Sequence, residues 1–175
     1  MLGLERGTVR LAPYTPEWPR LFEEERRRIE EAVGGHALAV EHVGSTSVPG
    51  LPAKPIIDIM LAVRELSEVE HCVAPIERLG YVYKGENGLP ERHFFAKGEP
   101  RTHHIHLVRI DGDHWRKHLL FRDYLRQHPT LAQEYAALKR RLAEQYHSDR
   151  AAYTDAKNPF ITRVLELAAA HQHQP

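Results

Sequence analysis

The stretch EHVGSTSVPGLPAKPIIDI, residues 41–59, decides the fold of this chain because it contains two strand segments and the loop between them. The alternation of residues in ALAVEHVG (37–44) predicts the first strand. Three prolines, one glycine and three hydroxyl side chains in STSVPGLPAKP (45–55) predict a rigid, irregular loop. The run IIDIMLAV (56–63) is apolar except for Asp58, which is typical of a strand buried on both faces.

The rest of the chain predicts helices and short strands around this unit. An apolar stripe predicts a helix over residues 15–33, and a capping box of Ser67 and Glu70 predicts a second helix that ends at Gly80. We expect a single α+β (α/β-like) domain over residues 1–175, with its core at about 9–167, a mixed sheet of about five strands and a C-terminal helical layer. The remaining predicted elements are strands at 81–84, 93–97 and 104–110, and helices at 114–127, 130–147 and 159–171.

The composition excludes several classes of protein. The chain has 175 residues, with 24 Lys and Arg side chains against 24 Asp and Glu, and 13 histidines. A net charge of zero argues against bulk nucleic-acid binding but allows a local basic pocket for one small ligand. The single cysteine, Cys72, excludes an intramolecular disulfide. The N-terminal residues carry charge where a signal peptide is apolar, and no apolar run approaches the roughly 20 residues that span a bilayer, so we expect a cytoplasmic protein with no membrane partner.

Gly44, Ser45 and Asp58 form the most informative chemical pattern. Glycine lets the backbone approach a ligand closely, and the hydroxyl and N–H groups of the following turn can hold phosphate oxygens. Asp58 on the next strand can then hold a divalent cation against those phosphates, which makes it the candidate catalytic residue. The pattern resembles the nucleotidyltransferase superfamily, in which Gly-Ser is followed about a dozen residues later by two acids separated by one residue. The second acid is missing here, because Met60 stands in its place.

His104 and His106 are the candidate partners of Asp58 in a metal site. Alternate residues of a strand point to the same face, so both imidazoles can converge on Asp58 if the two strands are neighbours. One carboxylate and two imidazoles suit zinc, manganese or iron better than magnesium, although the sequence leaves the identity of the metal, including Mg, Mn and Zn, open. The alternative is a polar groove in which these histidines only form hydrogen bonds. His42, just before the Gly-Ser turn, is a weaker candidate for the same pocket.

The remaining candidates are phosphate-binding side chains. Ser47 follows Ser45 in the loop, and Lys54 ends the proline-rich segment. Arg92 precedes a strand that we expect to border the cleft. Lysine and arginine neutralise and orient bound phosphate groups. We therefore expect a small phosphate-containing ligand or nucleotide to contact Gly44, Ser45, Ser47, Lys54 and Arg92.

Residues 41–59 as a whole closely resemble the signature of the GrpB family. Five further segments support the resemblance, namely PYTPEWPRLFEEE (13–25), RHFFAKG (92–98), RTHHIHLV (101–108), HWRKHLLFRDYLRQHP (114–129) and YTDAKNPFI (153–161). The resemblance implies a nucleotidyltransferase-like fold and a relation to domains fused to dephospho-CoA kinases in some bacteria. Three functions remain open, namely a divergent nucleotidyltransferase, a non-catalytic binding or protein-folding accessory module and, less favoured, a metal-dependent hydrolase that uses Asp58 and the histidines.

Overall fold

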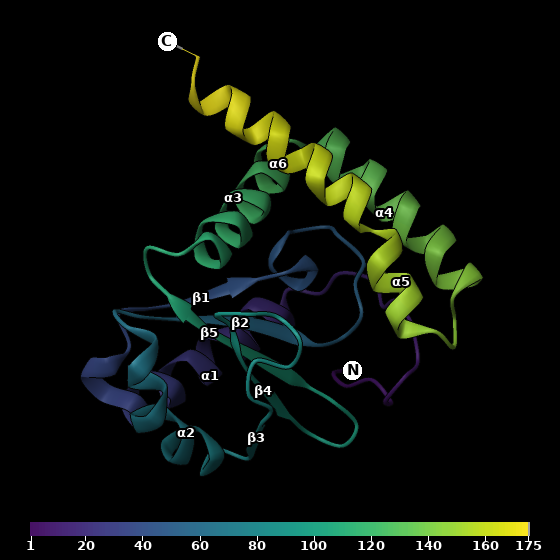
Figure 1. Ribbon diagram of the computed structural model, residues 1–175. Coiled ribbons are helices and arrows are strands. Elements are labelled where there is room, and N and C mark those ends of the chain that lie inside the picture. The colour runs from purple at the N-terminus through teal and green to yellow at the C-terminus, as the bar shows by residue number, and fades with distance from the viewer. Residues whose placement is uncertain (175) are drawn as a thin grey trace.

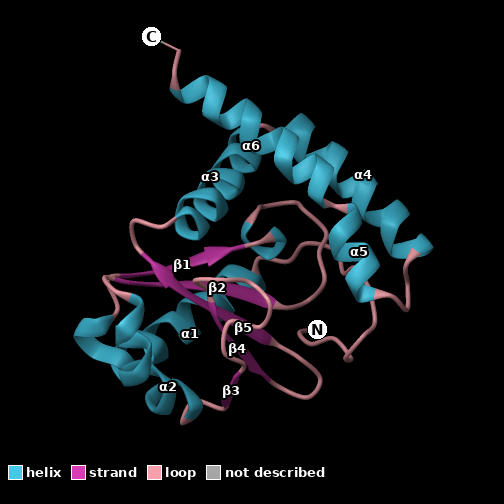
Figure 2. Ribbon diagram, in the orientation of Figure 1, coloured by secondary structure: helices cyan, strands magenta, loops and turns pink. Residues whose placement is uncertain are grey.

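A five-stranded mixed sheet in the order β1-β2-β5-β4-β3 forms the centre of the molecule (Figure 2). The structure is a computed structural model that describes residues 1–174. The inner strands β2 and β5 run parallel, and the other three neighbouring pairs run antiparallel. The strands span Ala39–Val43 (β1), Ile57–Val63 (β2), Tyr81–Tyr83 (β3), His93–Lys97 (β4) and His103–Arg109 (β5).

Within residues 1–174, six α-helices pack on the two faces of the sheet (Figure 1). Helices α1 and α2 cover one face, which we call the α1 face, and α3 to α6 lie over the other, which we call the α3 face. No helix in this range is both long and apolar enough to cross a membrane. The helices span Glu17–Val33 (α1), Val69–Glu77 (α2), Asp113–Gln127 (α3), Pro129–Gln145 (α4), Arg150–Ala156 (α5) and Asn158–Gln172 (α6).

The main hydrophobic core lies between the sheet and the helices α1 and α2. Trp18, Phe22 and Ile29 of α1 are at most 5% exposed and belong to one cluster with alternate residues of β2, including Ile57 and Ile59. Full burial of one such side chain contributes about 1.5–3 kcal/mol to stability. Because this core fixes which residues of β2 face α1, the residues between them must face α3.

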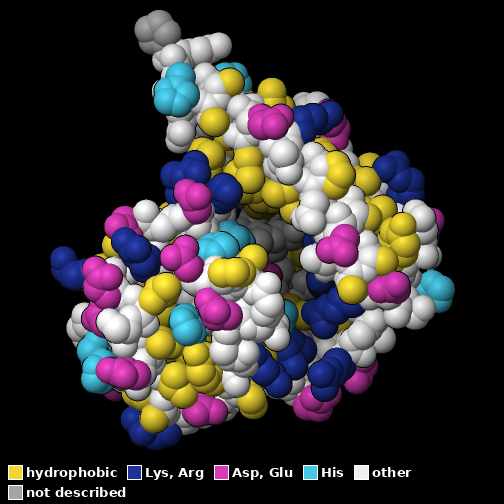
Figure 3. Space-filling view, viewed as in Figure 1, with side chains coloured by type: hydrophobic (Ala, Val, Ile, Leu, Met, Phe, Trp, Pro, Cys, Tyr) yellow, Lys and Arg dark blue, Asp and Glu magenta, His cyan; other side chains and the backbone are white. Residues whose placement is uncertain are grey.

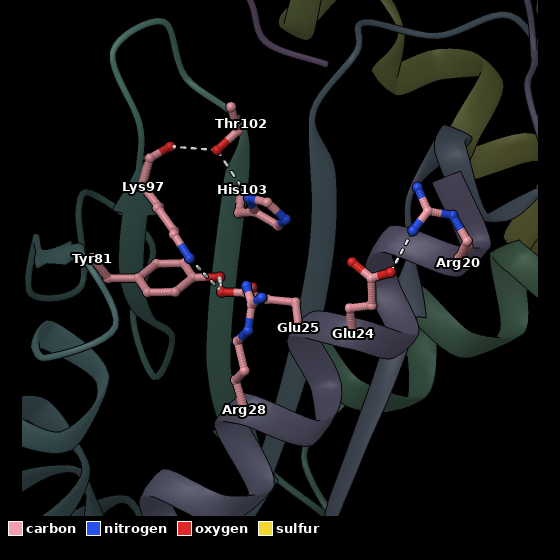
Figure 4. A network of polar contacts seen from close by, with 8 residues as sticks. All are labelled: Arg20, Glu24, Glu25, Arg28, Tyr81, Lys97, Thr102 and His103. Carbon is pink, nitrogen blue, oxygen red and sulfur yellow. Dashed lines mark hydrogen bonds and ion pairs between the residues drawn. The ribbon is translucent and has the colours of Figure 1, made fainter. Parts of the chain in front are cut away.

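A buried polar network on the α1 face ties α1 to the far strands (Figure 4). Glu25 is 2% exposed and accepts hydrogen bonds from the Tyr81 hydroxyl and the Lys97 ammonium, each at 2.8 Å. Arg28 lies 3.2 Å from the same carboxylate. His103 of β5 lies on this face too, hydrogen-bonded to Thr102 (Figure 4). His104, the next residue of β5, must therefore point to the α3 face.

The predicted α+β class, the mixed five-stranded sheet and the C-terminal helical layer are confirmed. Helix α5 was not predicted, and Asp149 begins it by accepting a hydrogen bond from the Ala152 N–H at 3.0 Å. The capping box predicted at Ser67 and Glu70 is wrong, because Glu65 and Glu68 form it two residues earlier.

Candidate functional site

Asp58, His104 and His106 converge on the α3 face of the two inner strands. The parallel register places Asp58 beside His104, and alternation places His106 on the same side. Oδ1 of Asp58 lies 3.2 Å from Nδ1 of His104 and 3.2 Å from Nε2 of His106. One ligand atom from each residue lies within 4.8 Å of the others. The sheet therefore brings the three predicted metal ligands together.

The protonation of these three groups follows from their contacts. Burial alone would raise the pKa of Asp58, but the hydrogen bonds from His104 and His106 hold it well below its usual value. An ionised carboxylate only accepts hydrogen bonds, so Nδ1 of His104 and Nε2 of His106 are the donors. Burial lowers the pKa of His104 despite its bond to Asp58, which keeps that ring neutral near pH 7. A cation on these atoms would replace the two ring protons.

Gly44 controls how closely the β1 turn approaches Asp58. Its φ of 73° and ψ of −175° belong to a region that is essentially restricted to glycine. A Cβ atom at this position would lie 2.8 Å from Oδ2 of Asp58. The short 3₁₀ helix Ser45–Ser47 follows directly. The Gly-Ser turn and the carboxylate thus lie in contact, as the sequence pattern predicts.

A cavity of about 410 Å³ opens above these residues, between the sheet and α3 to α6. Ser47 and Arg92 do not line it. Ser47 turns its hydroxyl onto the Gly44 carbonyl, and Arg92 lies beside the site with its guanidinium 3.4 Å from Nδ1 of His106. Six of the predicted site residues do line the cavity, namely Gly44, Ser45, Lys54, Asp58, His104 and His106.

Five Lys and Arg side chains line the cavity, namely Lys54, Lys117, Lys139, Arg150 and Lys157, and we call the four of them other than Lys117 the basic wall. Burial and the charges of Lys157 and Arg150 lower the pKa of Lys54 to about 7. Burial lowers the pKa of Lys157 to about 8. Lys139 is 1% exposed, donates to the Pro52 carbonyl, and has its pKa held well below its usual value by burial and by neighbouring lysines. Among the cavity-lining residues in the described chain, Asp58 is the only acid.

Sequence reasoning identified Lys54 but missed the other three members of the basic wall. The sequence does contain a sign that Lys139 is buried, because it lies four residues after Tyr135 and therefore on the same, buried face of α4. Lys157 directly precedes the Asn158-Pro159 helix start, and Arg150 begins the helix that was not predicted.

His118 lies near the cluster of Asp58, His104 and His106, whereas His42 does not. His118 of α3 lines the cavity, and its ring centroid is 6.1 Å from that of His106. His42 stacks on Phe22 of α1 at 4.8 Å between centroids, and its Nε2 atom lies 2.8 Å from the hydroxyl of Thr46, which lines the cavity. His42 itself does not line the cavity, because strand alternation turns its ring to the α1 face, and it reaches the cavity only through Thr46.

The chain is similar to known proteins both in sequence and in structure. The UPF0157 protein of Pseudomonas aeruginosa is 43% identical over 173 residues, which cover 95% of this chain and 70% of that protein. The crystal structure of conserved protein GrpB from Enterococcus faecalis matches with a TM-score of 0.87 and 38% identity, over 94% of this chain and 100% of that chain.

A longer protein contains a similar region. The dephospho-CoA kinase of Mycolicibacterium paratuberculosis is 32% identical over 192 residues, and the match covers 94% of this chain but 47% of the kinase. The family model described as GrpB protein matches residues 8–167. These matches extend over nearly the whole fold, including both strands of the site, and the chain belongs to the GrpB family.

Proposed function

We propose that the cavity binds a small phosphate-containing ligand, of the nucleotide class, together with a divalent cation on Asp58, His104 and His106. The basic wall is the observation that carries this proposal. It brings four cationic side chains to a cavity whose described lining has a single carboxylate. Lysine and arginine side chains bind and orient phosphate oxygens.

The depressed pKa values support an anionic ligand. Lys139 is buried, Lys54 and Lys157 are half-buried, and like charges contribute to lowering the pKa of each of them. A phosphate monoester brings a charge of about −1.5 to −2 at neutral pH. Bound between these groups, it would favour their protonated forms and replace mutual repulsion with charge-assisted hydrogen bonds.

The donor set fits a divalent cation. Two imidazole nitrogens and one carboxylate oxygen suit zinc and manganese, whereas magnesium prefers oxygen ligands alone. Phosphate oxygens would complete the coordination from the side of Ser45 and the basic wall. Asp58 already accepts hydrogen bonds from both rings, so one ligand atom from each of the three residues lies close enough to the others for a single cation.

Met60 favours a second candidate function, non-catalytic binding in an accessory role. Two-metal transfer of phosphoryl groups needs several carboxylates near the paired cations. Met60 is fully buried in a small cluster with Val43 and Val108, so no acid stands at the position of the second one. The Gly-Ser turn and Asp58 support a nucleotidyltransferase-like ancestry, and Met60 argues that transfer chemistry has been lost.

Calorimetric titration of the purified chain with ATP and Mn²⁺ tests the binding proposal. We expect Asp58→Asn and Lys157→Met each to weaken binding by about tenfold or more. The matched controls are Asp111→Asn, whose side chain is 64% exposed in a turn, and Arg78→Met, which is exposed at the end of α2. Equal affinities in variants and controls would contradict the proposal.

Radiolabelled ATP separates the two candidate functions. Label that moves from the nucleotide to an acceptor only in the presence of Asp58 supports transfer. Binding without turnover across hydroxyl-bearing acceptors supports the accessory role.

A further inference from the structure

A second cavity of about 330 Å³ lies beside the first. It is bordered by the N-terminal segment, the loop before β4 and the loop before β5. Figure 3 shows a group of Lys and Arg side chains below the central hollow of the molecule. The charged residues that line this second cavity are Arg6, Lys84, Glu99, Arg101 and Arg150.

The second cavity is strongly cationic. Four of its lining residues are lysine or arginine, and Glu99 is the only acid among those that the structure describes. Within residues 1–174, none of these four cations lies within ion-pair distance of a carboxylate. The other surface arginines of α1 and α3 mostly pair with an acid on the same helix. Unpaired cations at one concave surface point to an anionic ligand.

Arg150 connects the two cavities, because it lines both. Its Nη2 atom is buried and has no hydrogen-bond partner in the described chain. A buried guanidinium donor without a partner is costly, and an anion between the cavities would satisfy it. Burial lowers the pKa of Arg150, Asp58 of the first cavity raises it, and Arg101 of the second cavity lowers it.

Phe94 links the surface of the second cavity to the histidines of the first. Its ring centroid lies 4.9 Å from that of His104 and 5.4 Å from that of His106. It also lines the second cavity. A ligand that spans the two cavities would therefore cross an aromatic surface between two cationic ones.

We infer that the second cavity binds a second phosphate group of the same ligand, so that the ligand is a bisphosphate with its two phosphates at separate positions. This inference rests on the proposed binding of one phosphate in the main cavity. Four cations suit a dianionic phosphate better than a single carboxylate. Arg150 lies between the two phosphates and contacts both.

Calorimetry with simple probes tests the inference. The probes are straight-chain alkanediol bisphosphates of two to eight carbons and the monophosphates of the same diols, each with Mn²⁺. We expect one chain length to bind the wild type about tenfold or more tightly than its monophosphate, because the second contact is intramolecular. Arg101→Met and Lys84→Met should remove this gain and leave the monophosphate affinity unchanged. Arg150→Met should weaken both probes, and the control Arg78→Met neither.

The two probes separate the two proposals. Monophosphate binding without a gain for any bisphosphate would overturn the second phosphate subsite and leave the proposed function intact. A gain that survives the Arg101→Met, Lys84→Met double variant would also overturn it. No binding of either probe would contradict both proposals. Thermal unfolding of each variant shows that the fold is retained, and Lys84, whose side chain is exposed, provides a variant with little structural risk.

Discussion

Nη1 of Arg92 lies 3.4 Å from Nδ1 of His106, so His106 is the acceptor in this contact. A guanidinium carries only donors, which places the proton of the neutral ring on Nε2, facing Asp58. Arg92 is held there by the Glu86 and Asn87 carbonyls, which accept from Nη2. A metal-bound histidine normally donates its other ring N–H to an acceptor. Metal binding through Nε2 of His106 would therefore turn an N–H toward Arg92.

The first prediction is that Arg92→Ala raises the affinity for Zn²⁺ or Mn²⁺ alone. Without the guanidinium, a water molecule can accept a hydrogen bond from the Nδ1–H of His106 when the metal is bound to Nε2. Changes to residues that hydrogen-bond to a metal ligand alter the affinity for the metal about 10–100-fold. The same variant should weaken phosphate binding, because a nearby cation is lost. Metal titration in the absence and presence of pyrophosphate measures both effects. A fall in the affinity for metal alone would show that Arg92 supports the metal site.

The second prediction concerns the close approach of Gly44 to Asp58. Gly44→Ala should destabilise the fold by about 1–3 kcal/mol from backbone strain and should also displace the Asp58 carboxylate. Gly50→Ala is the matched control, since Gly50 has a φ of 80° but nothing within 4 Å of an added Cβ. Urea unfolding should show a loss in both variants. Mn²⁺ binding should be lost only in Gly44→Ala, and equal metal affinities would show that Asp58 does not need this contact.

The sequence was sufficient to predict that Asp58, His104 and His106 converge, but not to predict the basic wall. Strand alternation put His104 and His106 on one face, and the buried strand around Asp58 had to lie inside the sheet, where β5 is its parallel neighbour. The basic wall depends on how α4 to α6 fold back over the sheet, and local pattern does not determine such long-range packing. Lys139 begins a run of three cations, 139–141, that resembles a solvated helix face, yet it is the one that is buried.

The third prediction is that anion binding weakens as the pH rises. Lys54 has a pKa of about 7 and Lys157 a pKa of about 8, so both lose their protons between about pH 7 and 9. Sulfate keeps its charge over this range and would bind best to the protonated forms. Its affinity should therefore fall with rising pH, at up to about tenfold per pH unit for each group above its pKa. Lys54→Met should remove the part of this dependence near pH 7, whereas Arg78→Met should preserve it. A flat profile in the wild type would contradict the role of these lysines.

The fourth prediction concerns the Glu25 network, on the face opposite the site. Loss of one partner from a buried charge pair costs about 3–5 kcal/mol, so we expect Glu25→Gln to destabilise the fold strongly at pH 7. Tyr81→Phe removes one hydrogen bond to the same carboxylate and should cost about 1 kcal/mol. Burial raises the pKa of Glu25, but the hydrogen bonds from Lys97 and Tyr81 and the charge of Lys97 lower it to a net value below normal.

The sign of the pH dependence follows from that shift. A carboxyl group with a folded pKa below its unfolded value stabilises the fold above the unfolded pKa, and this contribution is lost as the pH falls through the folded pKa. Urea unfolding at a series of pH values should therefore show a smaller difference between wild type and Glu25→Gln in acid than at pH 7. Metal and phosphate affinities should remain at wild-type values in Glu25→Gln, because the network and the site lie on opposite faces of the sheet. A weakened metal site in this variant would show that the network also positions β5, through His103 and its neighbour His104.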